Sequence, residues 1–263
     1  MKESGGKSGV CLKKPKIALL LFAFSLLLFL TMIVSPIQVT AANTIKASST
    51  NFQINHVNHE VQIWNGGMTT INDTISLSPK PGENTTSVAS FSMGFPFKYK
   101  PDIDYCFAYN ASNPNQLFDV TLDADLGRIG FYGVRVVFPE PISISAESPY
   151  KFTVFFVFSN LVSTEAITAY NSETGENETY VYFHINFPTY PSFTQNASSC
   201  NVTVVLPENS DIVPGESSFD EKDISYNIFE RGPHKVFNLT LSSLAEFSLE
   251  SDMIEFASDV TII

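Results

Sequence analysis

The sequence predicts an all-β fold, in which an antiparallel β-sandwich follows one N-terminal hydrophobic helix. Three observations support this fold class. Apolar and polar side chains alternate with a period of two in nearly every segment after residue 50. Prolines and glycines interrupt these segments at intervals of about ten residues, as in sandwiches built from many short strands. No segment after Val39 keeps a helical periodicity over a full helical window.

Residues 1–42 are predicted to be a lysine-rich cytoplasmic segment and a signal sequence. Ile17–Val34 is an 18-residue stretch without a charged side chain, and five lysines precede it. It is long enough to cross about 30 Å of hydrocarbon, and the lysines keep its leading end in the cytoplasm. Val39-Thr40-Ala41 offers small residues to a signal peptidase. The hydrophobic segment can therefore be either a cleaved signal peptide or a retained signal anchor.

Either outcome exports the chain after about Asn43. The body is therefore expected to be extracytoplasmic, in the extracellular space or the ER lumen, as part of a membrane-anchored or secreted protein. Residues 50–263 contain no internal repeat and no low-complexity linker, and we interpret them as one domain.

The first strands of this domain follow from their alternation. Thr69–Leu77 places its isoleucines and Leu77 on one face, and Asn65-Gly66-Gly67 before it is a strong hairpin signal. Ala89–Phe95 alternates with small polar residues and stops at Pro96. Lys151–Phe158 is apolar on both faces, which predicts a central strand that is covered on both sides.

The later strands repeat the pattern. A second hairpin is predicted at Asn171–Asn177, and the segments Cys200–Leu206 and Val236–Leu241 each point alternate apolar residues inward. Asp259–Ile263 is an apolar run at the end of the sequence. We expect it either to continue into a further domain or to pair within a complex.

Seven Asn-x-Ser/Thr sequons are candidate glycosylation sites in an exported chain, unless they reflect only an abundance of Asn and Thr. In three of them, alternation turns the asparagine to solvent and its neighbour, Ile71, Val202 or Leu239, to the core. The sequon asparagines are Asn72, Asn84, Asn110, Asn177, Asn196, Asn201 and Asn238.

Two cysteines, Cys106 and Cys200, fall in the exported body. In an oxidising compartment they can form one disulfide. The alternative is a pair of buried free thiols.

Charge argues against nucleic acid as a partner. The formal net charge is −12, and after the first 16 residues only 10 basic side chains remain against 26 acidic ones. Such a body offers phosphate groups no electrostatic attraction.

The motifs of the common catalytic sites are missing, so we expect no enzyme activity, no cofactor and no metal. There is no Gly-x-Ser-x-Gly elbow and no phosphate-binding glycine loop. His59-Glu60 opens a zinc motif that lacks its second histidine, and His56 and His59 face opposite sides of a strand, where we expect both to be solvated. Asp123–Gly127 has part of a calcium loop without the glutamate at its end, which favours a polar turn.

Aromatic residues are expected to serve mainly the core, because 23 phenylalanines accompany a single tryptophan and Phe has no polar atom to satisfy when buried. Any aromatic interface should lie where prolines prevent a central strand. Phe187 and Tyr190, in the segment Phe187–Pro191, are the candidates. The alternative is an ordinary loop that packs on its own domain.

From residue 50 onward, the order of aromatic and proline features resembles the N-terminal lumenal domain of the ribophorin I family. These features are Phe138–Pro141, Pro149-Tyr150, Thr168–Tyr170, Tyr182-Phe183, Phe187–Pro191, Cys200–Leu206, Glu230–Pro233 and Val236–Leu239. The resemblance implies a non-catalytic accessory or scaffold module of a membrane-bound oligosaccharyltransferase complex for protein N-glycosylation. It implies membrane-embedded oligosaccharyltransferase subunits as partners and supplies no catalytic residues.

The sequence departs from that family in the layout of its domains and membrane segments. Ribophorin I adds a second lumenal domain and a C-terminal membrane helix, and the hydrophobic segment here is N-terminal. The alternative is an independent cell-surface β-sandwich that acts as a binding or envelope protein. A second β domain and a C-terminal hydrophobic helix after Ile263, or co-purification with a multi-spanning transferase, would decide for the accessory module of the glycosylation complex.

Overall fold

The computed structural model describes residues 51–213, 215 and 217–258. Within them the chain is almost entirely β-structure, which confirms the all-β prediction. The predicted hydrophobic helix and the apolar run at Asp259–Ile263 lie outside the described residues. No helix in the described part of the chain is long and apolar enough to cross a membrane.

The strands are β1 (Phe52–Ile63), β2 (Thr69–Pro79), β3 (Thr85–Pro96), β4 (Ile103–Asn110), β5 (Asn113–Leu122), β6 (Phe131–Ser145), β7 (Tyr150–Phe158), β8 (Val162–Asn171), β9 (Glu176–Pro188), β10 (Ser192–Phe193), β11 (Ala197–Glu208), β12 (Ser210–Ile212), β13 (Asn227–Arg231), β14 (His234–Leu244) and β15 (Ser251–Ser258). A 3-10 helix, η1 (Phe97–Asp102), and one short helix, α2 (Ser218–Glu221), accompany them.

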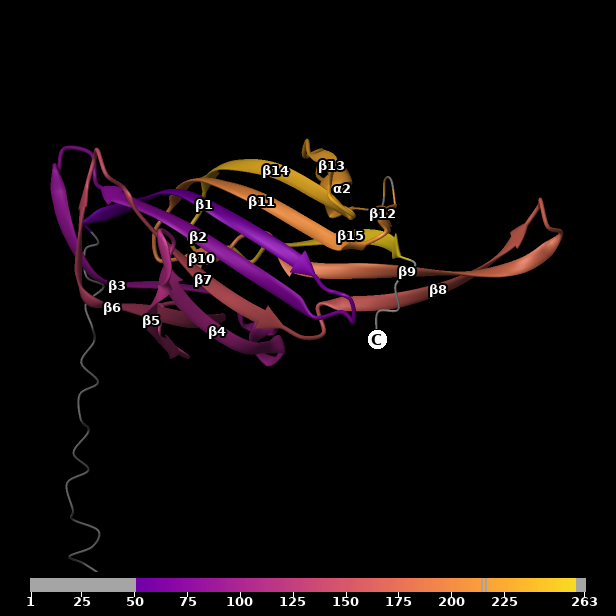
Figure 1. Ribbon diagram of the computed structural model, residues 1–263, viewed down its shortest axis with the longest axis horizontal. Helices are drawn as coiled ribbons and strands as arrows, with labels where there is room; N and C mark the ends of the chain where they lie inside the picture. The colour runs from indigo at the N-terminus through magenta and orange to yellow at the C-terminus, as the bar shows by residue number, and fades with distance from the viewer. Residues whose placement is uncertain (1–50, 214, 216, 259–263) are drawn as a thin grey trace, which may run out of the picture. The chain divides into compact units, whose positions relative to one another are not determined.

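These strands form two sheets (Figure 1). The larger has eleven strands in the order β10-β3-β6-β5-β4-β7-β2-β1-β11-β14-β13, and the smaller has four in the order β12-β15-β9-β8. All described pairings are antiparallel except that of β1 with β11, which is parallel. The prediction of a purely antiparallel fold is wrong at this pair, because side-chain alternation is the same for both strand directions.

Both predicted hairpins are confirmed. At the β1–β2 turn, Gly66 and Gly67 adopt φ values of 92° and 82°, which β-carbons would disfavour. The Gly67 amide donates to the Trp64 carbonyl at 3.0 Å, and this closes the turn. At the β8–β9 turn, the Gly175 amide donates to the Asn171 carbonyl at 2.9 Å.

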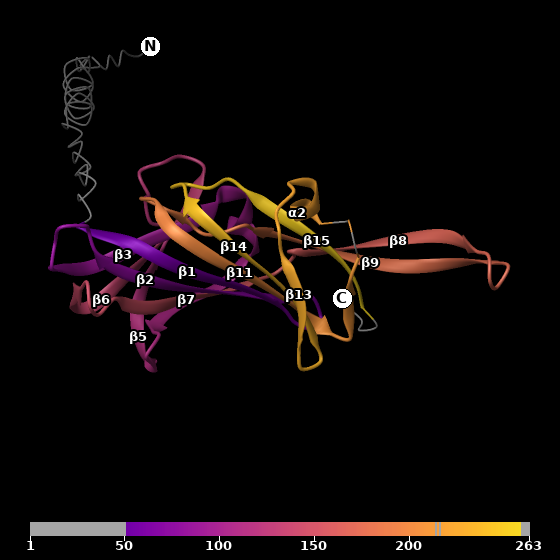
Figure 2. The same cartoon turned by 90° about the horizontal axis from the view of Figure 1, so that it is seen from above.

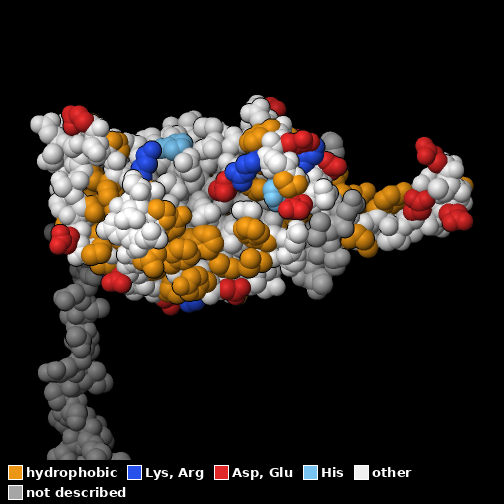
Figure 3. Space-filling model, in the orientation of Figure 1, with side chains coloured by type: hydrophobic (Ala, Val, Ile, Leu, Met, Phe, Trp, Pro, Cys, Tyr) orange, Lys and Arg blue, Asp and Glu red, His pale blue; other side chains and the backbone are white. Residues whose placement is uncertain are grey.

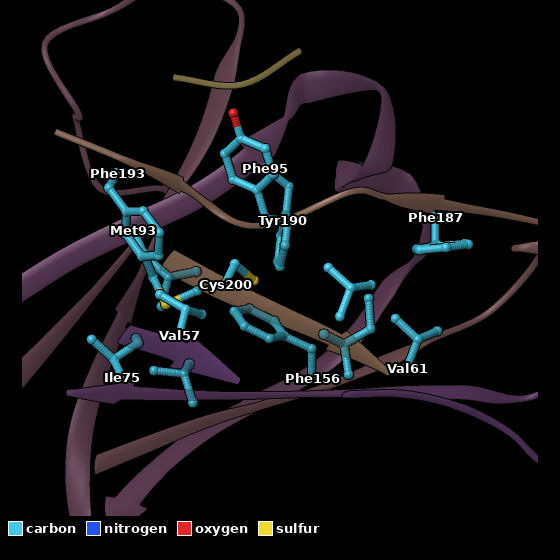
Figure 4. Packing of buried hydrophobic residues seen from close by; sticks show 14 of the residues in the cluster. Val57, Val61, Ile75, Met93, Phe95, Phe156, Phe187, Tyr190, Phe193 and Cys200 are labelled. Atoms are coloured by element: carbon cyan, nitrogen blue, oxygen red, sulfur yellow. The ribbon is translucent and has the colours of Figure 1, made fainter. Parts of the chain in front are cut away.

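Alternate residues of the central strands build the core. β7 contributes four fully buried side chains, Phe152, Val154, Phe156 and Phe158. The ring centroids of Phe95, from β3, and Phe156 lie 4.9 Å apart in an edge-to-face arrangement, a geometry that adds about 0.5–1.5 kcal/mol to area burial. Side chains of both sheets join one hydrophobic cluster, part of which is shown in Figure 4.

The opposite face of β7 differs from the prediction. Phe155 and Val157 point away from the core and are only partly buried. The prediction that this strand is covered on both faces is therefore wrong. Its central position in the large sheet is set by backbone pairing with β2 and β4, not by a second packed layer.

Candidate binding face

The outer face of the large sheet carries a strip of aromatic side chains that the core does not use. Tyr105, Phe107 and Tyr109 occupy alternate positions of β4, and the register places Phe107 opposite Phe155 and Tyr105 opposite Val157. Tyr105 remains 59% exposed. We call the set of Tyr105, Phe107, Tyr109, Phe155 and Val157 the aromatic strip. Figure 3 shows hydrophobic side chains gathered over β4 and β7 on this face.

The rings of the strip contact one another. The centroids of Phe107 and Phe155 lie 4.8 Å apart, and those of Phe107 and Tyr109 lie 5.8 Å apart. Phe107 is thus held between neighbours, so its orientation is set before any partner arrives. Exposed apolar clusters with polar surroundings are typical of interaction sites, and Tyr and Phe are enriched in them.

A polar ladder continues the same face beyond β2. The register pairs Asn201 with Thr240 and Thr203 with Asn238, so two sequons lie side by side on β11 and β14. The Asn238 side-chain amide donates to Thr203 Oγ1 at 2.9 Å and to Asn201 Oδ1 at 3.2 Å. Thr240 Oγ1 donates to Asn201 Oδ1 at 3.2 Å. The face therefore offers both aromatic and amide groups to a ligand.

The sequence matches no family model and no curated protein. Among solved structures it is similar to an M1 zinc metallopeptidase from Deinococcus radiodurans, with 11% identity over 79% of this chain and 42% of that chain and a TM-score of 0.41. A point mutant of that enzyme gives 10% identity, the same coverage and a TM-score of 0.40. The chain thus spans less than half the length of these structures. A likeness this weak assigns neither a family nor an activity.

Three sequon asparagines, Asn72, Asn201 and Asn238, lie on the side of their strands that alternation predicts. None of the seven is buried: Asn84, Asn177 and Asn196 are exposed, and Asn72, Asn110, Asn201 and Asn238 are partly exposed. The neighbours Ile71 and Val202 are fully buried and Leu239 is nearly so, which confirms the strand register. Attachment of glycans at these sites stays a prediction.

The predicted disulfide is absent, and both cysteines are free thiols. Cys106 lies on β4 and Cys200 on β11, with β7, β2 and β1 between them. At about 4.8 Å per strand step, their separation far exceeds the roughly 7 Å that a disulfide can bridge. Burial, with a smaller effect of Asp73, raises the pKa of Cys106 to about 12 and raises the pKa of Cys200 as well. Neither thiol is a ready nucleophile.

The predicted interface residues belong to the core. Phe187 is 0% exposed and Tyr190 is 7% exposed, and Figure 4 shows both among the buried side chains with Phe156. Prolines do keep the segment after β9 out of a central strand. It nevertheless packs inward, because Thr189 Oγ1 donates to the buried Asp252 carboxylate at 2.6 Å. Phe187 and Tyr190 therefore offer no surface to a partner.

A buried His–Asp pair on β1 and β2 was not predicted. His59 and Asp73 lie opposite each other and are fully buried, whereas we expected a solvated histidine. His59 Nδ1 is 2.6 Å from Asp73 Oδ1, and Nε2 is 2.9 Å from the Pro188 carbonyl oxygen. Since a carbonyl only accepts, Nε2 must carry a proton, and one further proton lies between Nδ1 and Oδ1. The pair is uncharged overall and ties the end of β9 to the large sheet.

This pair does not have the arrangement of a catalytic dyad. Both nitrogens of His59 are already bonded, and neither faces a nucleophile or solvent. Burial raises the pKa of Asp73, and the neighbouring His59 acts in the opposite direction. Asp73 Oδ2 has no hydrogen-bond partner among the described residues, which further disfavours the charged carboxylate.

The direction of this pKa shift predicts a pH dependence. A raised folded-state pKa means that stability from Asp73 is present below its ordinary pKa of 3.8 and is lost as the pH rises towards the folded value. The difference in unfolding free energy between wild type and Asp73→Asn should be constant below about pH 4. Above about pH 4, the wild type should lose stability relative to Asp73→Asn by up to about 1.4 kcal/mol per pH unit.

Urea unfolding of the two proteins at several pH values between about 3.5 and about 8 measures this difference. A difference that moves in favour of the wild type as the pH rises would contradict a raised pKa.

The remaining metal candidates do not form sites. His56 is on the opposite face from His59, as predicted, with Nδ1 2.8 Å from Ser199 Oγ. Asp125 Oδ1 accepts the Gly127 amide at 2.7 Å, and Lys100 Nζ lies 3.2 Å from Asp123 Oδ2. These bonds make the loop a polar turn. The described residues contain no group of three side chains that could hold a metal ion.

Proposed function

We propose that this chain is a non-catalytic accessory or scaffold module of a membrane-bound protein N-glycosylation complex. The aromatic strip is the observation that carries the binding role, because it keeps apolar rings on an open sheet face although the core has ample phenylalanine. The resemblance to the ribophorin I lumenal domain supports the choice of complex. On this proposal the body is extracytoplasmic and the N-terminal segment attaches or directs it to the membrane.

We further infer that the two sheets act as a β-sandwich. Phe187 of β9 and Phe256 of β15, in the small sheet, belong to the same hydrophobic cluster as Ile71 and Phe156 of the large sheet. A sandwich whose inner faces are occupied by its own core leaves the outer faces for partners. The aromatic strip lies on such an outer face.

Changing Tyr105 to alanine tests this role. Tyr105 is largely exposed, so the substitution should alter stability by less than about 0.5 kcal/mol. If the strip is the centre of an interface, recovery of a multi-spanning oligosaccharyltransferase subunit from solubilised membranes should fall at least about tenfold.

Leu249→Ala is the matched control, because the Leu249 side chain is about as exposed as that of Tyr105 and lies outside the strip. It should leave both stability and recovery unchanged. Unchanged recovery in Tyr105→Ala would contradict the strip as an interface. Loss of a partner other than a glycosyltransferase would favour the independent cell-surface binding protein.

A further inference from the structure

The β8–β9 hairpin extends beyond the sheet to which it belongs. β9 pairs with β15 only from Phe183 to Pro188. From Glu165 to Asn171, β8 pairs with β9 and with nothing else described. At about 3.3 Å per residue, this free part spans roughly 23 Å. Figures 1 and 2 show it projecting away from both sheets in two perpendicular views. We call it the ribbon.

Hydrogen bonds between side chains, rather than a hydrophobic core, hold the two strands of the ribbon together. An isolated two-stranded hairpin is only marginally stable in water. Here the Glu178 carboxylate accepts from Asn171 Nδ2 at 2.9 Å, Thr174 Oγ1 at 2.8 Å and Tyr180 OH at 2.9 Å. The same bonds, with that from Asn171 largest, lower the pKa of Glu178. The tip is therefore built with a fixed shape.

The ribbon also keeps apolar side chains in water. Ile167, Tyr170, Tyr180 and Val181 are all exposed, Tyr170 by 68%. Ile167 lies directly opposite Tyr180 and Ala166 opposite Val181, so both faces of the ribbon carry an apolar pair. None of these side chains joins the hydrophobic core. They contribute little to folding and are available to a partner.

The charge of the ribbon indicates what that partner is. Glu165, Glu173, Glu176 and Glu178 lie in or beside it, and the sequence has no Lys or Arg between Lys151 and Lys222. Anionic lipid headgroups and a second copy of the same ribbon would both be repelled. A protein segment that carries Lys or Arg is the complementary surface.

The free edge of β8 provides the means of attachment. β8 ends its sheet, and its ten residues contain no proline, lysine or arginine. Its pairing with β9 runs without a bulge. Proline, lysine and bulges often protect a long edge strand, and an edge without them can accept a strand from another chain.

We propose that the ribbon is a docking element, to which a partner protein adds an extended segment along β8 that carries basic and apolar residues two positions apart. Glu165 and Ile167 lie on the same face of the ribbon, and Ile167 lies opposite Tyr180. On that face the basic side chains of the partner meet Glu165 and the acidic tip, and the apolar ones cover Ile167 and Tyr180. The aromatic strip is a different surface, so this inference does not depend on the proposed role of that strip.

Photo-crosslinking in the full-length chain tests the inference. A photoreactive amino acid replaces Ala166, which is exposed on β8, and crosslinked peptides from native membranes are identified by mass spectrometry. We expect a peptide of another protein that carries Lys or Arg and an apolar residue two positions apart. The triple variant Glu165→Gln/Glu173→Gln/Glu176→Gln should reduce its yield at least about fivefold. Glu178 is retained because it holds the ribbon together.

The matched control is Glu140→Gln/Glu147→Gln/Glu246→Gln, which removes the same charge from exposed positions elsewhere. It should leave the yield within about twofold. A second variant, Ile167→Lys, should abolish the crosslink while thermal unfolding is unchanged. Equal yields in the ribbon and control triple variants would overturn the proposal. Crosslinks only to lipid, or only to another copy of this chain, would overturn it as well.

Discussion

Replacing His59 by leucine should lower the free energy of unfolding by about 3–5 kcal/mol. The substitution leaves the Asp73 carboxyl group buried without its partner, and it removes the donor to the Pro188 carbonyl. Both groups then lose hydrogen bonds in a place that water does not reach. Urea unfolding at neutral pH, followed by circular dichroism, measures the loss.

A double-mutant cycle separates the pair from the packing around it. Asp73→Leu alone should cost about 1–3 kcal/mol, because it leaves one ring nitrogen of His59 unpaired. His59→Leu/Asp73→Leu should be more stable than His59→Leu, since it no longer buries an unpaired carboxyl group and only the Pro188 carbonyl lacks its donor. His56→Leu, on the opposite face of β1, is the control and should cost less than about 1 kcal/mol. Additive losses in the cycle would show that the two residues do not interact.

Alternation predicted strands such as β11 and β14 because buried and more exposed residues alternate along them. The sequon segments show why: Asn201 and Asn238 sit on the open face and Val202 and Leu239 in the core. The same rule could not predict that β1 and β11 run parallel, since strand direction leaves the side-chain period unchanged. Nor could it predict that three strands separate Cys106 from Cys200, because strand order depends on contacts distant in sequence.

The buried pair did leave a signal in the sequence. His59 lies between Val57 and Val61 on one face of β1, and Asp73 lies between Ile71 and Ile75 on β2. Counting back from the glycine turn also places the two polar residues opposite each other. The prediction of a solvated His59 did not use this pattern.

The aromatic strip was missed for a related reason. Phe155 and Val157 make β7 apolar on both faces, and a strand of that kind is usually buried on both. Tyr105, Phe107 and Tyr109 form the same pattern on β4, with Cys106 and Ala108 turned to the core. Two adjacent strands with apolar outer faces fit either a second packed layer or an interface. Only the structure distinguishes them, through the exposure of Tyr105.

Replacing Val204 by aspartate should destabilise the protein by more than about 4 kcal/mol. Val204 is fully buried on β11, where its neighbours are Val61 on β1 and Phe237 on β14. Neither of these neighbouring side chains offers a hydrogen-bond donor to a carboxylate. The new side chain would therefore be forced to take up a proton, and the loss of stability should be smaller near pH 4 than at pH 7.

Asn201→Asp is the matched control, because it introduces the same carboxylate on the same strand but on the open face. Its oxygen can still accept from Asn238 Nδ2 and Thr240 Oγ1, which donate to Asn201 Oδ1 in the wild type. The cost should stay below about 1 kcal/mol. Chemical unfolding of both variants at the two pH values measures the contrast. Equal destabilisation by the two substitutions would mean that the register of β11 is shifted by one residue, which would exchange its inner and outer faces.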